Sequence, residues 1–224
     1  MYMADDVKGR RSYHSPKRRA QAAVTRSRLI TAAARLFAER GFLGTTMADV
    51  AAAAGVSTPL VFGVFENKAG LLTAAIGVAV RGDEADAPLR EQPDWQQMLA
   101  SPGGEEVLRR FAALQRVING RAWALIDVGR AAAATDPALA ELVAAGARNR
   151  WSDCREVAGV LVARGALREG VDVATAADAV WAMCSSELYR MLVVERGWNP
   201  QSYEQWLSDV LTSRLLERPM SDPR

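Results

Sequence analysis

The chain has 224 residues, of which 50% are hydrophobic and 24% charged, so it can bury a sizeable core in one or two domains and is not a disordered tail. Its longest apolar stretch, residues 69–80, has twelve residues and is too short to span a bilayer. Charged residues stand near the N-terminus where a secretory signal would need an apolar stretch, so we expect a soluble, cytoplasmic protein with no membrane partner.

The formal net charge of +2 is divided unevenly along the chain. Residues 1–80 hold eleven Lys or Arg against five Asp or Glu, and residues 81–224 hold seventeen against twenty-one. A basic N-terminal third followed by an acidic remainder favours a polyanionic partner for the first part alone, although a solubilising tail would give the same excess.

Two cysteines and one histidine are the candidate zinc ligands. Cys154 and Cys184 lie thirty residues apart without a CxxC spacing, and His14 lies among basic residues near the N-terminus. This inventory supports neither a zinc site nor a disulfide framework, and we predict no metal and no cofactor. We interpret the cysteines as small buried hydrophobes, with a redox switch as the alternative.

Apolar residues spaced by three and four predict a first helix over about residues 22–40, which Gly41 ends. Its inward face consists of Leu29, Ala33, Leu36 and Phe37. Thr46 then caps a second helix, because Thr46-x-x-Asp49 fits a capping box, and Gly55 ends it.

Two further helices complete the first eighty residues. Pro59 at a first-turn position, with Ser57 or Thr58 as the cap, predicts a very short third helix that ends near residue 65. Asn67 caps a fourth helix that ends near residue 80.

Glycines and prolines in residues 82–104 indicate a connector with at most a short helix at residues 94–100. No strand-like alternation is present, so the predicted fold class is all-α. The remaining helical patterns cover residues 105–133, with an interruption near Asn119 and Gly120, and residues 137–165, 172–196 and 201–216.

The two short helices at residues 46–54 and 58–65, with a glycine-containing turn between them, have the form of a helix-turn-helix. At the start of the second helix, Ser57, Thr58 and Pro59 are small enough to approach phosphates and base edges in a major groove. This segment therefore predicts DNA binding.

Residues 25–76 resemble the DNA-binding domain of the TetR family of bacterial transcriptional regulators. The resemblance rests on the motifs LFAERGF, TT-x-x-DVAAAAGVS and F-x-x-K-x-x-L. Residues 165–215, with GAL, the Trp181 helix and RGW-x-P-x-x-YEQWL, are similar to the family's ligand and dimer domain. The expected fold is an N-terminal helix-turn-helix domain of three or four helices, followed by a C-terminal helical bundle for ligand binding and dimerisation.

We divide the chain into a basic tail (residues 1–21), a DNA-binding domain (residues 22–81) and an effector-binding and dimerisation domain (residues 82–224). The resemblance implies a homodimer that binds a palindromic operator in double-stranded DNA. It also implies a repressor that a small-molecule effector releases by entering the C-terminal bundle.

The resemblance further implies a phosphate-contacting cap at Thr46, a recognition helix opened by Ser57 and Thr58, and a phosphate-binding lysine at Lys68. A helix N-terminus suits this role because its free amides carry a partial positive charge. The expected DNA contacts are Thr45, Thr46, Ser57, Thr58, Pro59, Phe62, Gly63 and Lys68.

Phe62 departs from the family pattern, in which a tyrosine often offers its hydroxyl to phosphate, and Gly63 and Val64 replace residues that are often polar or aromatic. Together with Thr58 and Pro59, these residues can touch thymine methyls, but none makes the bidentate guanine contact of an arginine. Direct base reading is therefore sparse, and specificity is expected to depend on DNA shape.

Basic residues before the first helix offer a second contact with DNA. They can reach an adjacent minor groove or follow the phosphates, as the arms of other helix-turn-helix proteins do, and a solubilising leader is the alternative. These residues are Arg10, Arg11, Lys17, Arg18 and Arg19.

Large aromatic residues, and polar residues inside apolar stretches, are the candidates for effector contacts in the C-terminal domain. Aromatic residues at helical spacing are more often core, and a plain ion pair between Asp127 and Arg130 is the alternative for those two. The candidate effector-binding residues are Trp123, Asp127, Arg130, Trp151, Trp181 and Glu187.

A homodimer follows because one short recognition helix per subunit needs two half-sites, about 34–36 Å apart, to become selective. We expect it to form through the last two predicted helices, at residues 172–196 and 201–216, whose apolar stripes could instead be used within one chain.

Two other classes of protein remain as alternatives. An enzyme is disfavoured because the only histidine lies in the tail and no phosphate loop, nucleophile–base pair or metal cluster can be assembled, so we predict no catalytic residue. A helical protein-interaction module without DNA binding is the other, and the basic N-terminal third and the helix-turn-helix count against it.

Overall fold

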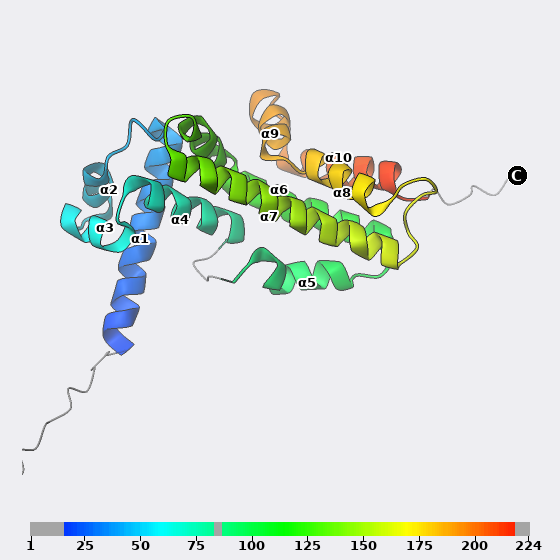
Figure 1. Cartoon of the computed structure of the whole chain (residues 1–224), viewed down its shortest axis with the longest axis horizontal. Helices are drawn as coiled ribbons and strands as arrows, with labels where there is room; N and C mark the ends of the chain where they lie inside the picture. The colour runs from blue at the N-terminus through cyan, green and yellow to red at the C-terminus, as the bar shows by residue number, and fades with distance from the viewer. Residues whose placement is uncertain (1–15, 83–86, 218–224) are drawn as a thin grey trace, which may run out of the picture.

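The computed structural model describes residues 16–82 and 87–217, and within these ranges the chain forms helices and no strand (Figure 1). The fold is therefore all-α, as predicted. The elements are α1 (Pro16–Arg40), α2 (Met47–Ala54), α3 (Thr58–Phe65), α4 (Lys68–Arg81), the 3₁₀ turn η1 (Leu89–Glu91), α5 (Pro93–Ala100), α6 (Gly103–Ala133), α7 (Pro137–Ala163), α8 (Val173–Met183), α9 (Ser186–Tyr189), the π-helix η2 (Arg190–Glu195) and α10 (Pro200–Leu215). No single helix in these ranges is long and apolar enough to cross a membrane, and the one pair that meets the length and composition together, α2 with α3, is bent by 109°.

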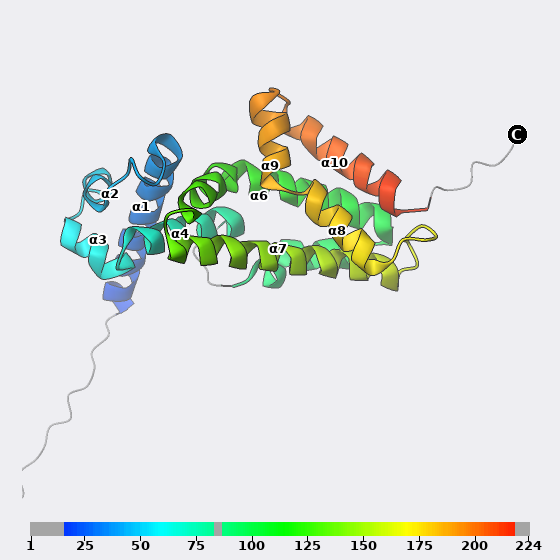
Figure 2. The same cartoon turned by 45° about the horizontal axis from the view of Figure 1, so that its top comes forward.

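Helices α1–α4 form a head at one end of the molecule, and α5–α10 form an elongated body (Figures 1 and 2). Each part has its own cluster of buried apolar side chains. The head's cluster also takes in Leu125 and Ala132 from α6 and Leu139 from α7, so the two long helices of the body are anchored in the head.

Helix α1 begins at Pro16, six residues before the predicted start. The added turns contain lysine, arginine, alanine and glutamine, which favour a helix although they form no apolar face. The predicted helix start at residue 22 was therefore wrong, and the first turns of α1 carry Arg18 and Arg19, both exposed.

Helix α6 runs without interruption through Asn119 and Gly120, where the sequence predicted a break. Both residues face neighbouring helices. The Asn119 side chain donates hydrogen bonds to the Cys184 carbonyl at 3.1 Å and to the Tyr203 hydroxyl at 3.3 Å, and a Cβ on Gly120 would lie 3.3 Å from the Tyr189 hydroxyl. The pair therefore serves close helix packing rather than a turn.

The predicted single helix over residues 172–196 is broken after α8. Cys184 leaves the helical conformation, and Ser185 caps α9 by accepting the N–H of Leu188 at 3.2 Å. The remainder continues as the π-helix η2. The Asn119 hydrogen bond to the Cys184 carbonyl supplies the partner that a continuous helix would otherwise provide, and this long-range contact has no signature in the local sequence.

Candidate nucleic-acid interface

The turn between α2 and α3 sets the two short helices at 109°, within the range of helix-turn-helix motifs. Gly55 makes this turn in the left-handed conformation, with φ of 65°, and its N–H donates to the carbonyls of Ala51 and Ala52. Ser57 caps α3 with its backbone only, so its exposed side chain is not consumed by a capping hydrogen bond.

Thr46 caps α2, and the predicted capping box is present. Its hydroxyl accepts the N–H of Asp49 at 3.1 Å, and its own N–H donates to the Asp49 carboxylate at 2.9 Å. The hydroxyl also donates to this carboxylate at 2.6 Å, and these hydrogen bonds lower the pKa of Asp49 because they stabilise its charged form. With the hydroxyl engaged, the free backbone N–H groups of α2 are the donors left for a phosphate oxygen.

Thr45 holds the loop between α1 and α2 and does not face solvent. Its side chain is fully buried, and its hydroxyl lies 3.1 Å from the Leu36 carbonyl and 2.9 Å from the Gly41 carbonyl. The prediction of a DNA contact by Thr45 is therefore wrong for its side chain, because a group with no exposed surface cannot reach a phosphate.

Lys68 is bound to the same loop. Its ammonium donates to the Phe42 carbonyl at 2.8 Å and to the Thr45 carbonyl at 3.0 Å, and it lies 4.3 Å from the centre of the Phe42 ring. Two of its three N–H groups are thus used inside the head, which leaves one for an outside anion. The same lysine fixes the loop and places a positive charge beside it.

Three helix N-termini meet at one hollow of the surface, of about 450 Å³. Thr46 caps α2, Thr58 begins α3 and Lys68 begins α4, and all three line it. The other lining residues are Met47, Ala48, Phe62 and Asn67. Because each helix start carries a partial positive charge and free N–H groups, the hollow suits a phosphate oxygen.

The outer face of α3 is apolar. Val61 and Phe65, four residues apart, face the core of the head, while Leu60, Phe62 and Val64 have exposed fractions of 43%, 47% and 36%. The sequence analysis did not select Leu60, although the inward spacing of Val61 and Phe65 already places it outside.

The other predicted positions of this helix are accessible. Pro59 and Gly63 are exposed and Thr58 is partly so. A Cβ on Gly63 would meet no atom within 4 Å, so its outer side is open. Of the eight residues in α3, only Thr58 has a polar side chain, which leaves hardly any donor or acceptor for base edges.

The basic residues near the head are partly committed to other contacts. Arg28 donates to the Ala54 carbonyl at the end of α2, and Arg26 lies over the Phe65 ring at 4.8 Å. Of the predicted arm, Arg10, Arg11 and the side chain of Lys17 lie outside the described residues.

Residues 29–75 match the family model described as bacterial regulatory proteins, tetR family. The helix-turn-helix segment of the chain is of the TetR type. The matched segment contains α2, α3 and their turn, and it ends inside α4. No curated protein sequence matches the chain.

Solved structures of TetR-like regulators share the fold. A transcriptional regulator from Saccharomonospora viridis in complex with choline is 19% identical, with a TM-score of 0.67 over 89% of this chain and 100% of that one. A SmeT–triclosan complex is 21% identical, with a TM-score of 0.66 over 90% and 98%. The regulator PfmR from Thermus thermophilus is 24% identical, with a TM-score of 0.61 over 87% and 98%.

Several candidate effector residues meet where α6 passes α9 and η2. Arg130 on α6 pairs with Glu187 on α9 at 2.5 Å, and Asp127 lies 3.3 Å from the guanidinium of Arg190 on η2. The alternative pairing of Asp127 with Arg130 is thus replaced by pairs between elements, because the short α9 and η2 fold back over this part of α6.

Trp181 on α8 has an indole N–H that is buried without a hydrogen-bond partner. The Arg150 guanidinium lies 4.5 Å from its ring centre and donates to its carbonyl at 2.8 Å. Trp123 is half-buried against the body's apolar cluster, whereas Trp151, which follows Arg150 on α7, is exposed and donates its indole N–H to Asp178 on α8 at 3.1 Å. Arg150 was not among the predicted residues, because it stands in a polar run that gives no sign of this contact.

Proposed function

We propose that the protein is a TetR-family regulator, which binds a palindromic operator as a homodimer and acts as a repressor that a small-molecule effector releases. The observation that carries the DNA-binding part is the hollow at which α2, α3 and α4 all begin, with the Lys68 ammonium beside it. Such a site holds one phosphate of each half-site, and this contact fixes the position of α3 in the major groove.

The methyl groups of thymine are the base atoms that best match the apolar outer face of α3. Leu60, Phe62 and Val64 are exposed and apolar, and an apolar side chain discriminates thymine through its 5-methyl group. Specificity then comes from these methyl contacts together with the shape of the operator.

The test is a mobility-shift titration of the full chain on DNA from its own promoter region. Phe62→Ala is expected to weaken binding about tenfold or more, because it removes an exposed aromatic surface from the reading helix. Val162→Ala is the matched control, since Val162 is 48% exposed on α7, and it should change the affinity less than about twofold. An equal effect of both variants contradicts the assignment of α3.

Replacing operator thymines with deoxyuridine tests the reading of methyl groups separately. Each substitution at a contacted thymine should weaken binding about fourfold, because one buried methyl is worth about 0.8 kcal/mol. Substitution at positions outside the protected half-sites provides the control. Unchanged affinity for the fully substituted operator would reject methyl reading and leave DNA shape as the source of specificity.

The dimer is proposed to use the last two predicted helices, which correspond to α8 through η2 and to α10. Met191, Val194 and Trp198 are exposed by 49%, 47% and 36%, and they give this region the apolar surface that a second copy would cover. Sedimentation at micromolar concentration should show a dimer.

The effector is proposed to bind where α6 meets α8 and α9. The support is the buried, unpartnered indole N–H of Trp181, together with the cross-helix pairs of Asp127, Arg130 and Glu187, which a ligand can replace. Two solved structures with this fold are complexes, one with choline and one with triclosan, and they support a small molecule as the effector.

The apolar face of α3 also favours one second candidate, a helical module that binds a protein partner, because such a face can be covered by protein. A salt-sensitive, sequence-selective DNA shift decides between the two. The division of the chain at residues 21 and 81, the cytoplasmic location and the lack of catalytic activity are retained as parts of the proposal.

A further inference from the structure

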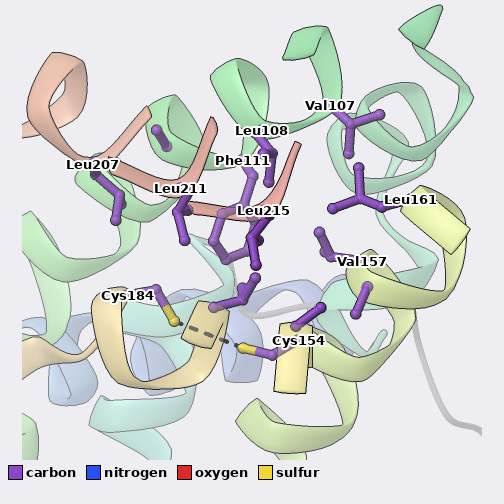
Figure 3. Packing of buried hydrophobic residues seen from close by; sticks show 14 of the residues in the cluster. Val107, Leu108, Phe111, Cys154, Val157, Leu161, Cys184, Leu207, Leu211 and Leu215 are labelled. Carbon is purple, nitrogen blue, oxygen red and sulfur yellow. Dashed lines mark hydrogen bonds between the residues drawn. The ribbon is translucent and has the colours of Figure 1, made fainter. Parts of the chain in front are cut away.

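The two cysteines of the chain face each other inside the body (Figure 3). The Cys154 sulfur, on α7, lies 3.7 Å from the Cys184 sulfur, at the end of α8, and both residues are buried. The apolar cluster of the body surrounds them. A disulfide bond is about 2.05 Å long, so the two sulfurs need to approach by less than 2 Å.

Cys184 occupies a position that permits this approach. It ends α8, and the next residue begins the four-residue helix α9, so its backbone is not held in the middle of a long helix. Short elements such as α9 and η2 open locally at low cost, and such opening admits a water-sized reagent. Cys154 lies within the long helix α7 and provides a fixed partner.

The two thiols have different surroundings, which favour Cys184 as the nucleophile and Cys154 as the proton donor. The Arg150 guanidinium lies 3.9 Å from the Cys184 sulfur. The hydrogen bond with the Cys154 thiol lowers the pKa of Cys184, burial opposes this effect, and the Arg150 cation adds to the lowering, whereas the same hydrogen bond and burial raise the pKa of Cys154.

We infer that Cys154 and Cys184 form an oxidation site at which a hydroperoxide converts the two thiols into an intramolecular disulfide. The Cys184 thiolate attacks one peroxide oxygen, the O–O bond breaks, and Cys184 becomes a sulfenic acid. The Cys154 sulfur then attacks the Cys184 sulfur, and the S–O bond breaks while the S–S bond forms. With hydrogen peroxide, the two thiols lose two electrons and two protons, and the peroxide becomes two molecules of water.

The pair is connected to the head through α6. The Cys184 carbonyl accepts a hydrogen bond from Asn119, and two residues further on the Ser186 hydroxyl accepts one from the Arg130 guanidinium at 3.4 Å. Further along α6, Leu125 and Ala132 belong to the core of the head. Movement of Cys184 towards α7 therefore acts on the helix that holds the head, and this consequence rests on the proposed DNA-binding function.

The test treats the full chain with hydrogen peroxide at low protein concentration, then unfolds it, alkylates free thiols and measures the intact mass. The expected product is 2 Da lighter, takes up no alkylating reagent, and yields a linked pair of peptides that contain Cys154 and Cys184. Cys154→Ser should instead accumulate a sulfenic acid on Cys184, which dimedone captures. The inference is overturned if both thiols are still alkylated after treatment, or if disulfides form only between chains. If a serine variant fails to fold, the result for the unmutated protein still decides.

A second readout measures the DNA affinity of the reduced and oxidised protein. The disulfide should change the affinity for the operator by at least about fivefold, because coupled sites in proteins commonly change each other's affinity by this factor or more. A change below twofold overturns the regulatory consequence. If the reduced protein binds no DNA, the proposed function fails, whereas the mass measurement still decides on the disulfide.

Discussion

The polar side chains of the head and of the body contact different kinds of partner. In the head, Thr45 and Lys68 bind backbone carbonyls of the loop before α2, so its shape is fixed by main-chain contacts. In the body, polar side chains join different helices, as in the pairs Arg116–Glu204 and Arg130–Glu187. The head is thus a preformed reading surface, while the body contains pairs that can exchange partners when a ligand or an oxidant acts on it.

The largest loss of stability is expected from a substitution that breaks the hydrogen bonds between helices of the body. Asn119→Ala removes the donor to the Cys184 carbonyl and the Tyr203 hydroxyl in a buried setting, and it should lower the free energy of unfolding by about 3 kcal/mol. Chemical denaturation measures this change. Asn149→Ala on the exposed side of α7 is the control, and a similar loss there would contradict the role of the network.

A smaller loss of stability is expected in the head, because the substitution removes one hydroxyl and keeps the volume of the side chain. Thr45→Val keeps the shape of the side chain but removes the hydroxyl that bonds the Leu36 and Gly41 carbonyls, so we expect a loss of about 2 kcal/mol. Thr31→Val, at an exposed position of α1, is the matched control in the same denaturation experiment. A Thr45→Val protein as stable as the control would show that the loop is held by Lys68 alone.

The smallest effect depends on pH. Burial raises the pKa of Asp153 to about 6, against the opposing influence of Arg90 at 3.5 Å. A raised carboxyl pKa costs stability above that pKa and costs nothing below the unfolded value, so Asp153→Asn should stabilise the body by about 1 kcal/mol at pH 8 and not at pH 3.5. Equal stabilisation at both pH values would contradict the assignment to this carboxyl group.

The same contrast explains what the sequence could predict. The starts of α2 and α4 and the end of α2 are set by Thr46, Asn67 and Gly55, whose capping contacts reach at most four residues along the chain, and these were predicted correctly. The break at Cys184 and the continuity of α6 through Gly120 depend on contacts between segments more than sixty residues apart, and the sequence predicted both incorrectly.

In the candidate site, too, features set by nearby residues could be predicted and features set by distant contacts could not. The helix-turn-helix and most of its exposed residues could be predicted because motif spacing sets them. The burial of Thr45 and the bonding of Lys68 to the loop could not, since both depend on how α4 packs against the end of α1. Arg150 beside Trp181 was missed because the two residues meet only when α7 and α8 pack together.

The central claim is that α3 of each subunit lies in a major groove of one operator. Hydroxyl-radical footprinting of the full chain on its promoter region tests it most directly. The account predicts two protected half-sites related by two-fold symmetry, with centres about 34–36 Å or a multiple of this apart. A single unpaired protected patch, or uniform protection that disappears in competition with unrelated DNA, would contradict it.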